Sequence, residues 1–95
     1  MLIHLFAEPK FPFGKLVATR NAVDRLSSED MSKALFRHGS CDWGDLCDED
    51  RTANDQALEG DLRLLSSYTS ANGVKFWIIT EWDRSVTTIL LPEDY

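Results

Sequence analysis

The sequence predicts an α+β fold, in which an antiparallel sheet of three to four strands carries two to three helices packed on it. The segment 62–95 holds three strand-like apolar runs separated by two turn signals, Asn72-Gly73 and the polar corner 82–85. Such a pattern is typical of a β-meander. Apolar residues also recur at helical spacing from Met31 to His38, which predicts the main helix.

The first half of the chain is predicted to begin irregularly and then to form a strand and helices. Two prolines favour an irregular segment over 1–13, and 14–19 is predicted to be a short strand. Asn21 is a candidate N-cap for a helix over 22–26, and Ser27 is a second start signal. The alternatives are one kinked helix, or a short turn followed by a helix that ends near Gly39.

The segment 41–61 is rich in acidic residues and is called the acidic segment below. It is predicted to form a third helix from about Asp48 to Leu58, ended by Gly60. Its apolar stripe is thin, so we expect most of the helix to face water. Acidic residues in its first turn favour the positive end of the helix dipole.

Turn chemistry also predicts the strand register. We expect a two-residue type I′ loop at Asn72-Gly73 and a corner at 82–85. The middle strand is apolar on both faces, which predicts a central position in the sheet. The predicted pairs are Ala71 with Val74, Thr69 with Phe76, Glu81 with Val86, and Ile78 with Ile89.

Length and composition predict one domain spanning 1–95. The chain is 43% hydrophobic and 27% charged, which is ordinary for a globular protein. No apolar run approaches the ~20 residues of a membrane span, and the N-terminus lacks the features of a signal peptide. We therefore expect a cytoplasmic protein without a membrane partner, either a monomer or a homodimer, in which Cys41 and Cys47 are reduced.

Charge is concentrated in one segment. The net charge is −6, and residues 41–61 alone carry eight acidic residues against a single base, Arg51. Such a surface repels nucleic acid phosphates, so we expect no direct nucleic acid binding. A basic groove on another protein is the natural partner.

His38, Cys41 and Cys47 come nearest to a catalytic or metal cluster. A thiolate beside a histidine is a nucleophile, and zinc would need a fourth ligand such as His4 or a nearby aspartate. The spacing matches no zinc pattern, and the carboxylates of 42–50 are not in EF-hand order. No cofactor loop or nucleophile motif is present in the sequence. We therefore expect no enzyme, no cofactor, no metal and no catalytic residues.

Two features are candidate partner-binding sites. Carboxylates of the acidic segment can mimic phosphates against a basic groove, or they merely keep the protein soluble. The corner carries a Trp and an Arg, which are enriched in binding hot spots, although turn bonds explain the same residues. The candidate residues are Asp42, Trp43, Asp45, Asp48, Glu49 and Asp50 in the acidic segment, and Trp82, Asp83 and Arg84 at the corner.

Four runs and one residue carry a family resemblance: LVAT at 16–19, DWGDL at 42–46, WIITE at 77–81, DRSVTTILLP at 83–92, and Asn54. Over about residues 14–95 they resemble a small bacterial family of plasmids, integrated elements and phages, whose members are labelled plasmid-related or type I restriction subunit. The chain is too short for a methyltransferase domain and has no glycine-rich cofactor loop. The resemblance implies a mobile-element setting, where small acidic proteins disarm restriction or CRISPR nucleases.

These observations predict a non-enzymatic inhibitor that occludes a basic surface of a host defence nuclease complex, of the anti-CRISPR or anti-restriction type. One alternative is an accessory or regulatory subunit of a plasmid-encoded complex, held by a sheet edge or by homodimerisation. Another is a small hydrolase or metal protein that uses His38, Cys41 and Cys47.

Overall fold

The computed structural model describes residues 8–95 and confirms the α+β prediction. Four strands form one sheet in the order β1-β4-β3-β2, and the meander β2-β3-β4 is antiparallel, while β1 pairs in parallel with β4. The strands are β1 (Lys15–Ala18), β2 (Leu64–Thr69), β3 (Lys75–Thr80) and β4 (Val86–Leu90). The helices are α1 (Arg20–Arg25), α2 (Ser28–Gly39) and α3 (Asp48–Gly60), followed by a 3-10 turn, η2 (Pro92–Asp94).

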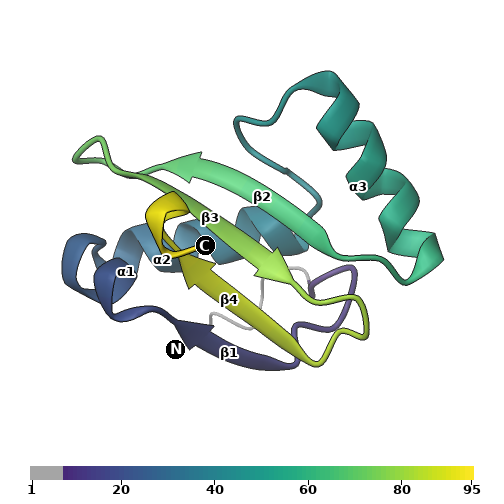
Figure 1. Cartoon of the computed structure of the whole chain (residues 1–95), viewed down its shortest axis with the longest axis horizontal. Coiled ribbons are helices and arrows are strands. Elements are labelled where there is room, and N and C mark those ends of the chain that lie inside the picture. The colour runs from purple at the N-terminus through teal and green to yellow at the C-terminus, as the bar shows by residue number, and fades with distance from the viewer. Residues whose placement is uncertain (1–7) are drawn as a thin grey trace.

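The helices occupy two different places around the sheet (Figure 1). α1 and α2 cover one face, α3 stands beside the edge strand β2, and the C-terminal turn lies on the opposite face. Phe76, Ile78 and Ile89 pack on the covered face with buried residues of α1 and α2, Ala22 and Ala34 among them. α1 and α2 therefore bury the main core, whereas α3 is left largely in solvent.

Two helix starts test the predicted caps. Ser27 caps α2 as predicted, because its side chain accepts a hydrogen bond from the Asp30 amide. The prediction of Asn21 as the cap of α1 is wrong: Thr19 accepts from the Ala22 amide and α1 begins at Arg20. α1 and α2 are two helices rather than one kinked helix.

The register of the meander is confirmed at one turn and wrong at the other. Ile78 pairs with Ile89 as predicted. In the first hairpin Tyr68 pairs with Phe76, one position away from the predicted pairing. Ser70 and Val74 close the hairpin, which leaves a three-residue loop with Gly73 at φ +84°. A three-residue loop that ends in a left-handed glycine is the usual alternative to the two-residue type I′ turn.

The outer edge of β2 is covered by the chain itself. The Ser67 amide donates to the Trp43 carbonyl at 3.1 Å, and the Asp45 amide donates to the Ser67 carbonyl at 2.7 Å. The Asn54 side chain, from α3, bonds both the carbonyl and the amide of Leu65, at 2.6 and 3.2 Å. An uncovered edge strand invites pairing with other chains, so these contacts protect β2 and fix α3 beside it.

The N-terminal segment is irregular over residues 8–13, as predicted, and the rest of 1–13 lies outside the described residues. Among residues 8–95, no helix combines the length and apolarity that a membrane crossing requires.

Candidate functional site

His38 is buried completely and belongs to a chain of side-chain hydrogen bonds that ends at a backbone carbonyl. Its Nδ1 lies 2.5 Å from Ser66 Oγ, and its Nε2 lies 2.9 Å from Thr80 Oγ1. Thr80 Oγ1 lies 2.8 Å from Thr87 Oγ1, which donates to the Phe13 carbonyl at 2.8 Å. Buried polar groups require such partners, and no buried side-chain polar atom is left unpaired in the described part of the chain.

The direction of this chain of bonds determines the tautomer of His38. Thr87 uses its proton on the Phe13 carbonyl, so the Thr80 hydroxyl donates to Thr87 and its oxygen accepts from His38 Nε2. Nδ1 then accepts from the Ser66 hydroxyl. Burial, with the nearby positive charge of Arg84, lowers the pKa of His38 to about 3. The imidazole is therefore neutral and structural, without access to a substrate.

The two cysteines do not complete a metal or nucleophilic site with His38. Both are free thiols, and burial raises the pKa of Cys41, which opposes thiolate formation. Within residues 8–95, no three or more His, Cys, Asp and Glu side chains are grouped so as to hold a metal ion. His4, the fourth candidate ligand, lies outside the described residues.

The exposed acidic residues gather on α3, on the loop that leads into it and at the residue that follows it. Seven carboxylates between positions 45 and 61 are exposed, and none of them forms an ion pair with a described residue. Arg51, the sole base of the segment, donates to the carbonyls of Gly44 and Leu46. The seven, here called the acidic surface, are Asp45, Asp48, Glu49, Asp50, Asp55, Glu59 and Asp61.

α3 can present this surface because only a narrow stripe of it packs against the sheet. Asn54 and Ala57 are its buried residues, and Leu58 is half-buried. Asp48, Glu49 and Asp50 occupy the first turn, where carboxylates interact favourably with the helix dipole. The helix is thus stable beside the sheet while most of its circumference faces solvent.

Two predicted contact residues of the acidic segment are instead engaged in contacts within the chain. Asp42 forms a bidentate ion pair with Arg37, at 2.7 and 3.1 Å, and this contact holds the pKa of Asp42 below its usual value. Trp43 is only 4% exposed, and its Nε1 donates to Asp55. The Trp43 ring packs in the small core cluster with Phe11, and this burial argues against the prediction that Trp43 contacts a partner.

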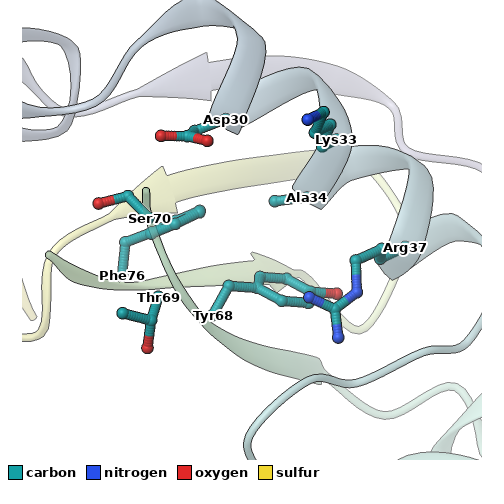
Figure 2. A pocket seen from close by; sticks show the side chains of 8 residues that line it. All are labelled: Asp30, Lys33, Ala34, Arg37, Tyr68, Thr69, Ser70 and Phe76. Carbon is teal, nitrogen blue, oxygen red and sulfur yellow. The ribbon is translucent and has the colours of Figure 1, made fainter. Parts of the chain in front are cut away.

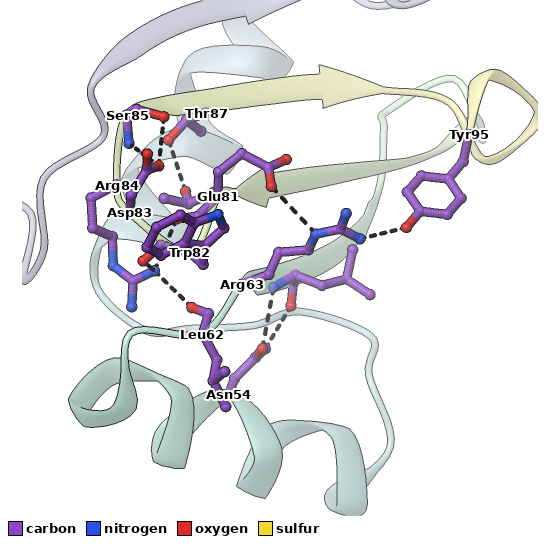
Figure 3. A network of polar contacts seen from close by, with 12 residues as sticks. Asn54, Leu62, Arg63, Glu81, Trp82, Asp83, Arg84, Ser85, Thr87 and Tyr95 are labelled. Carbon is purple, nitrogen blue, oxygen red and sulfur yellow. Dashed lines mark hydrogen bonds and ion pairs between the residues drawn. The ribbon is translucent and has the colours of Figure 1, made fainter.

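The three candidate residues at the corner between β3 and β4 have different roles. Trp82 is 61% exposed. Asp83 accepts from the Ser85 amide and hydroxyl, which lower its pKa and stabilise the turn. Arg84, at φ +59°, donates to four backbone carbonyls, those of Ala57, Leu62, Glu81 and Trp82 (Figure 3). Arg84 thus positions the corner, instead of offering its guanidinium to a partner.

The structure does not bring the two predicted sites together. Arg84 ties the corner to Ala57 and Leu62, at the C-terminal end of α3, while Asp48, Glu49 and Asp50 form the first turn of that helix. A helix of 13 residues is about 20 Å long. The acidic first turn and Trp82 therefore lie at opposite ends of α3.

A small cavity of about 150 Å³ lies between α2 and the end of β2 (Figure 2). Arg37 stacks over the Tyr68 ring at 4.8 Å on one side of it. Its other charged groups also have partners, since Asp30 accepts from the Ala71 amide and Lys33 lies 3.5 Å from Glu29. We assign no ligand to this cavity.

Sequence reasoning missed Leu62 as an exposed apolar residue and Asn54 as the contact that holds α3. Leu62 follows the acidic helix and directly precedes the first apolar run. In the sequence it is therefore indistinguishable from the first residue of a buried strand. Comparisons with protein-family models, with curated proteins and with solved structures find no match to this chain.

Proposed function

We propose that this chain is a non-enzymatic interaction protein whose acidic surface occupies a basic, nucleic-acid-binding groove of another protein. The observation that carries the proposal is the set of seven exposed carboxylates without ion-pair partners, five of them on α3, a helix that stands out from the sheet, and two beside it in the chain. Charge density of one sign on a projecting element steers it toward a partner of opposite sign.

The target class follows from the resemblance to the mobile-element family. Host restriction and CRISPR nucleases carry basic grooves for nucleic acid. A protein can fill such a groove with a dense negative charge and without catalysing a reaction. Inhibition of a host defence nuclease by occlusion is therefore the function we assign. The structural role of His38 supports a non-enzymatic mechanism, because the buried imidazole is fully used in internal hydrogen bonds.

The test is a charge reversal in the first turn of α3, Asp48→Lys with Glu49→Lys and Asp50→Lys, assayed by affinity capture from host lysate. We expect capture of a basic nuclease complex by the wild type, weaker capture as salt rises, and loss of capture with the reversal. The control reverses three exposed acids elsewhere, Glu8, Asp24 and Glu29, the last of which is paired with Lys33, and should retain capture. Equal capture by the two variants would contradict an acidic contact surface.

The second candidate function, an accessory subunit of a plasmid-encoded complex, is favoured by the edge strand β1. β1 pairs with β4 on one side, and no strand pairs with its other side within the described residues. A partner added there by backbone hydrogen bonds would be recovered at constant stoichiometry and with little salt dependence. The same capture experiment therefore distinguishes the two functions.

A further inference from the structure

Two large apolar residues are exposed near the C-terminal end of α3, one just after the helix and one at the corner of the sheet. Leu62 is 58% exposed and Trp82 is 61% exposed. Nη1 of Arg84 donates to the carbonyl of Leu62 at 2.7 Å and to that of Trp82 at 3.3 Å, so one guanidinium joins the two backbones. Figure 3 shows both residues around this guanidinium. We call these two residues the Leu62–Trp82 patch.

Hydrogen bonds within the chain position the backbone that carries the patch. Arg84 also donates to the Ala57 carbonyl at 3.0 Å, which anchors the corner to α3. The Asp83 side chain closes the turn through the Ser85 amide at 3.1 Å and hydroxyl at 2.6 Å. Binding residues that are already positioned lose less entropy on association, and Trp is the residue type most typical of hot spots.

The charges around the patch indicate what kind of partner it fits. Glu59 and Asp61 lie within three positions of Leu62, Asp83 follows Trp82, and all three side chains are exposed. None of the three carboxylates has an ion-pair partner among the described residues. The two neighbouring bases are already engaged within the chain, Arg63 with Glu81 and Tyr95 and Arg84 with four backbone carbonyls. An apolar pair bordered by exposed carboxylates complements an apolar pocket bordered by Lys and Arg.

We propose that the Leu62–Trp82 patch is an apolar anchor that enters an apolar pocket with a basic rim on the protein partner. This inference rests on the proposed function, because the same partner also meets the acidic first turn of α3. The two contacts have different roles. The acidic first turn accelerates association and depends on salt, whereas the anchor slows dissociation and depends little on salt.

The test uses two peptide probes of equal length and equal positive charge, oligolysine and an amphipathic Lys/Leu peptide. Binding of each labelled probe is followed by fluorescence anisotropy with the wild type and with Leu62→Ser and Trp82→Ser. The matched control is Val23→Ser, which removes a side chain that is equally exposed, at 56%, on α1. We expect the wild type to bind the Lys/Leu peptide at least about tenfold more tightly than oligolysine, or about 1.4 kcal/mol.

Both patch variants should lose this preference, and the control should keep it. Equal affinity for the two probes, or an equal loss with Val23→Ser, would overturn the anchor. The reversal of Asp48, Glu49 and Asp50 tests the proposed function separately, through oligolysine. If the patch variants lose the preference while the reversal leaves oligolysine binding unchanged, the result supports the anchor and overturns the acidic contact.

Discussion

The buried His38 predicts that this protein loses stability in a particular range of pH. Its pKa is lowered from 6.5 to about 3, so below pH 6.5 the unfolded chain takes up a proton that the folded chain excludes. The free energy of unfolding then falls with decreasing pH, by about 1.4 kcal/mol per pH unit for a single such group. The stability is fully present above pH 6.5 and declines until the folded pKa is reached.

The loss of stability caused by His38 can be separated from that caused by other titrating groups by the choice of pH. Asp42, Asp83 and Asp94 also have lowered pKa values, but their loss occurs below their ordinary value of 3.8. Between pH 6.5 and about 4.5, His38 should therefore dominate and cost about 2–3 kcal/mol. That loss is a large part of the total for a domain of this size, typically about 5–15 kcal/mol.

The variant that tests this reasoning is His38→Gln. A glutamine amide can accept from Ser66 and donate to Thr80, as the neutral imidazole does, but it does not titrate. Denaturant unfolding at a series of pH values should give a sloping profile for the wild type and a flat one for the variant between pH 4.5 and 6.5.

Two results would refute the account of His38. One is an equal slope for the wild type and for His38→Gln, since the buried imidazole would then carry no proton penalty. The other is a nitrogen-15 NMR spectrum that places the ring proton of His38 on Nδ1, which would reverse the deduced direction of the hydrogen-bond chain.

Three further substitutions test how the scaffold holds the candidate site. Gly44→Ala should lower the free energy of unfolding by about 3 kcal/mol or more, because a Cβ there would lie 2.0 Å from the Ser67 carbonyl oxygen. The control is Gly73→Ala, which has the same left-handed backbone but open space around it. It should lower the free energy of unfolding by about 1–2 kcal/mol. Asn54→Leu should lower the free energy of unfolding by about 2–4 kcal/mol and promote aggregation, since it leaves the backbone amide and carbonyl of Leu65 unpaired. Urea unfolding measures the first effect and light scattering the second. An unchanged urea midpoint would contradict the edge contact. Arg84→Lys should lower the denaturation midpoint, because a lysine cannot bond four carbonyls at once. It should also weaken binding of the Lys/Leu peptide and leave oligolysine binding unchanged. Equal weakening of both probes would argue against a positioning role.

The sequence could predict what depends on neighbours along the chain. The strands of the meander follow from its alternation and turn residues, and the Ile78–Ile89 register follows from the length of the corner. Ser27 could be recognised as a cap because its bonding partner, Asp30, is three residues away. The first hairpin was one position off because Asn72-Gly73 is compatible with both a two-residue and a three-residue loop.

What the sequence could not predict depends on contacts between distant segments. β1 joins β4 in parallel across about 70 residues of chain, and no local pattern specifies such a pairing. Trp43 was a candidate contact residue within the acidic segment, yet the chain around it bonds to Ser67 and its ring is buried. Arg84 has a charged side chain at a turn, and only the folded chain shows that its bonds reach α3.

Competition between this chain and nucleic acid for one groove tests the central claim most directly. A labelled duplex bound to the captured nuclease complex would be titrated with the wild type, with the reversal of Asp48, Glu49 and Asp50, and with the control reversal of Glu8, Asp24 and Glu29. Occlusion predicts that the wild type and the control release the duplex and that the α3 reversal does not. A complex that holds the chain and the duplex at the same time would contradict occlusion.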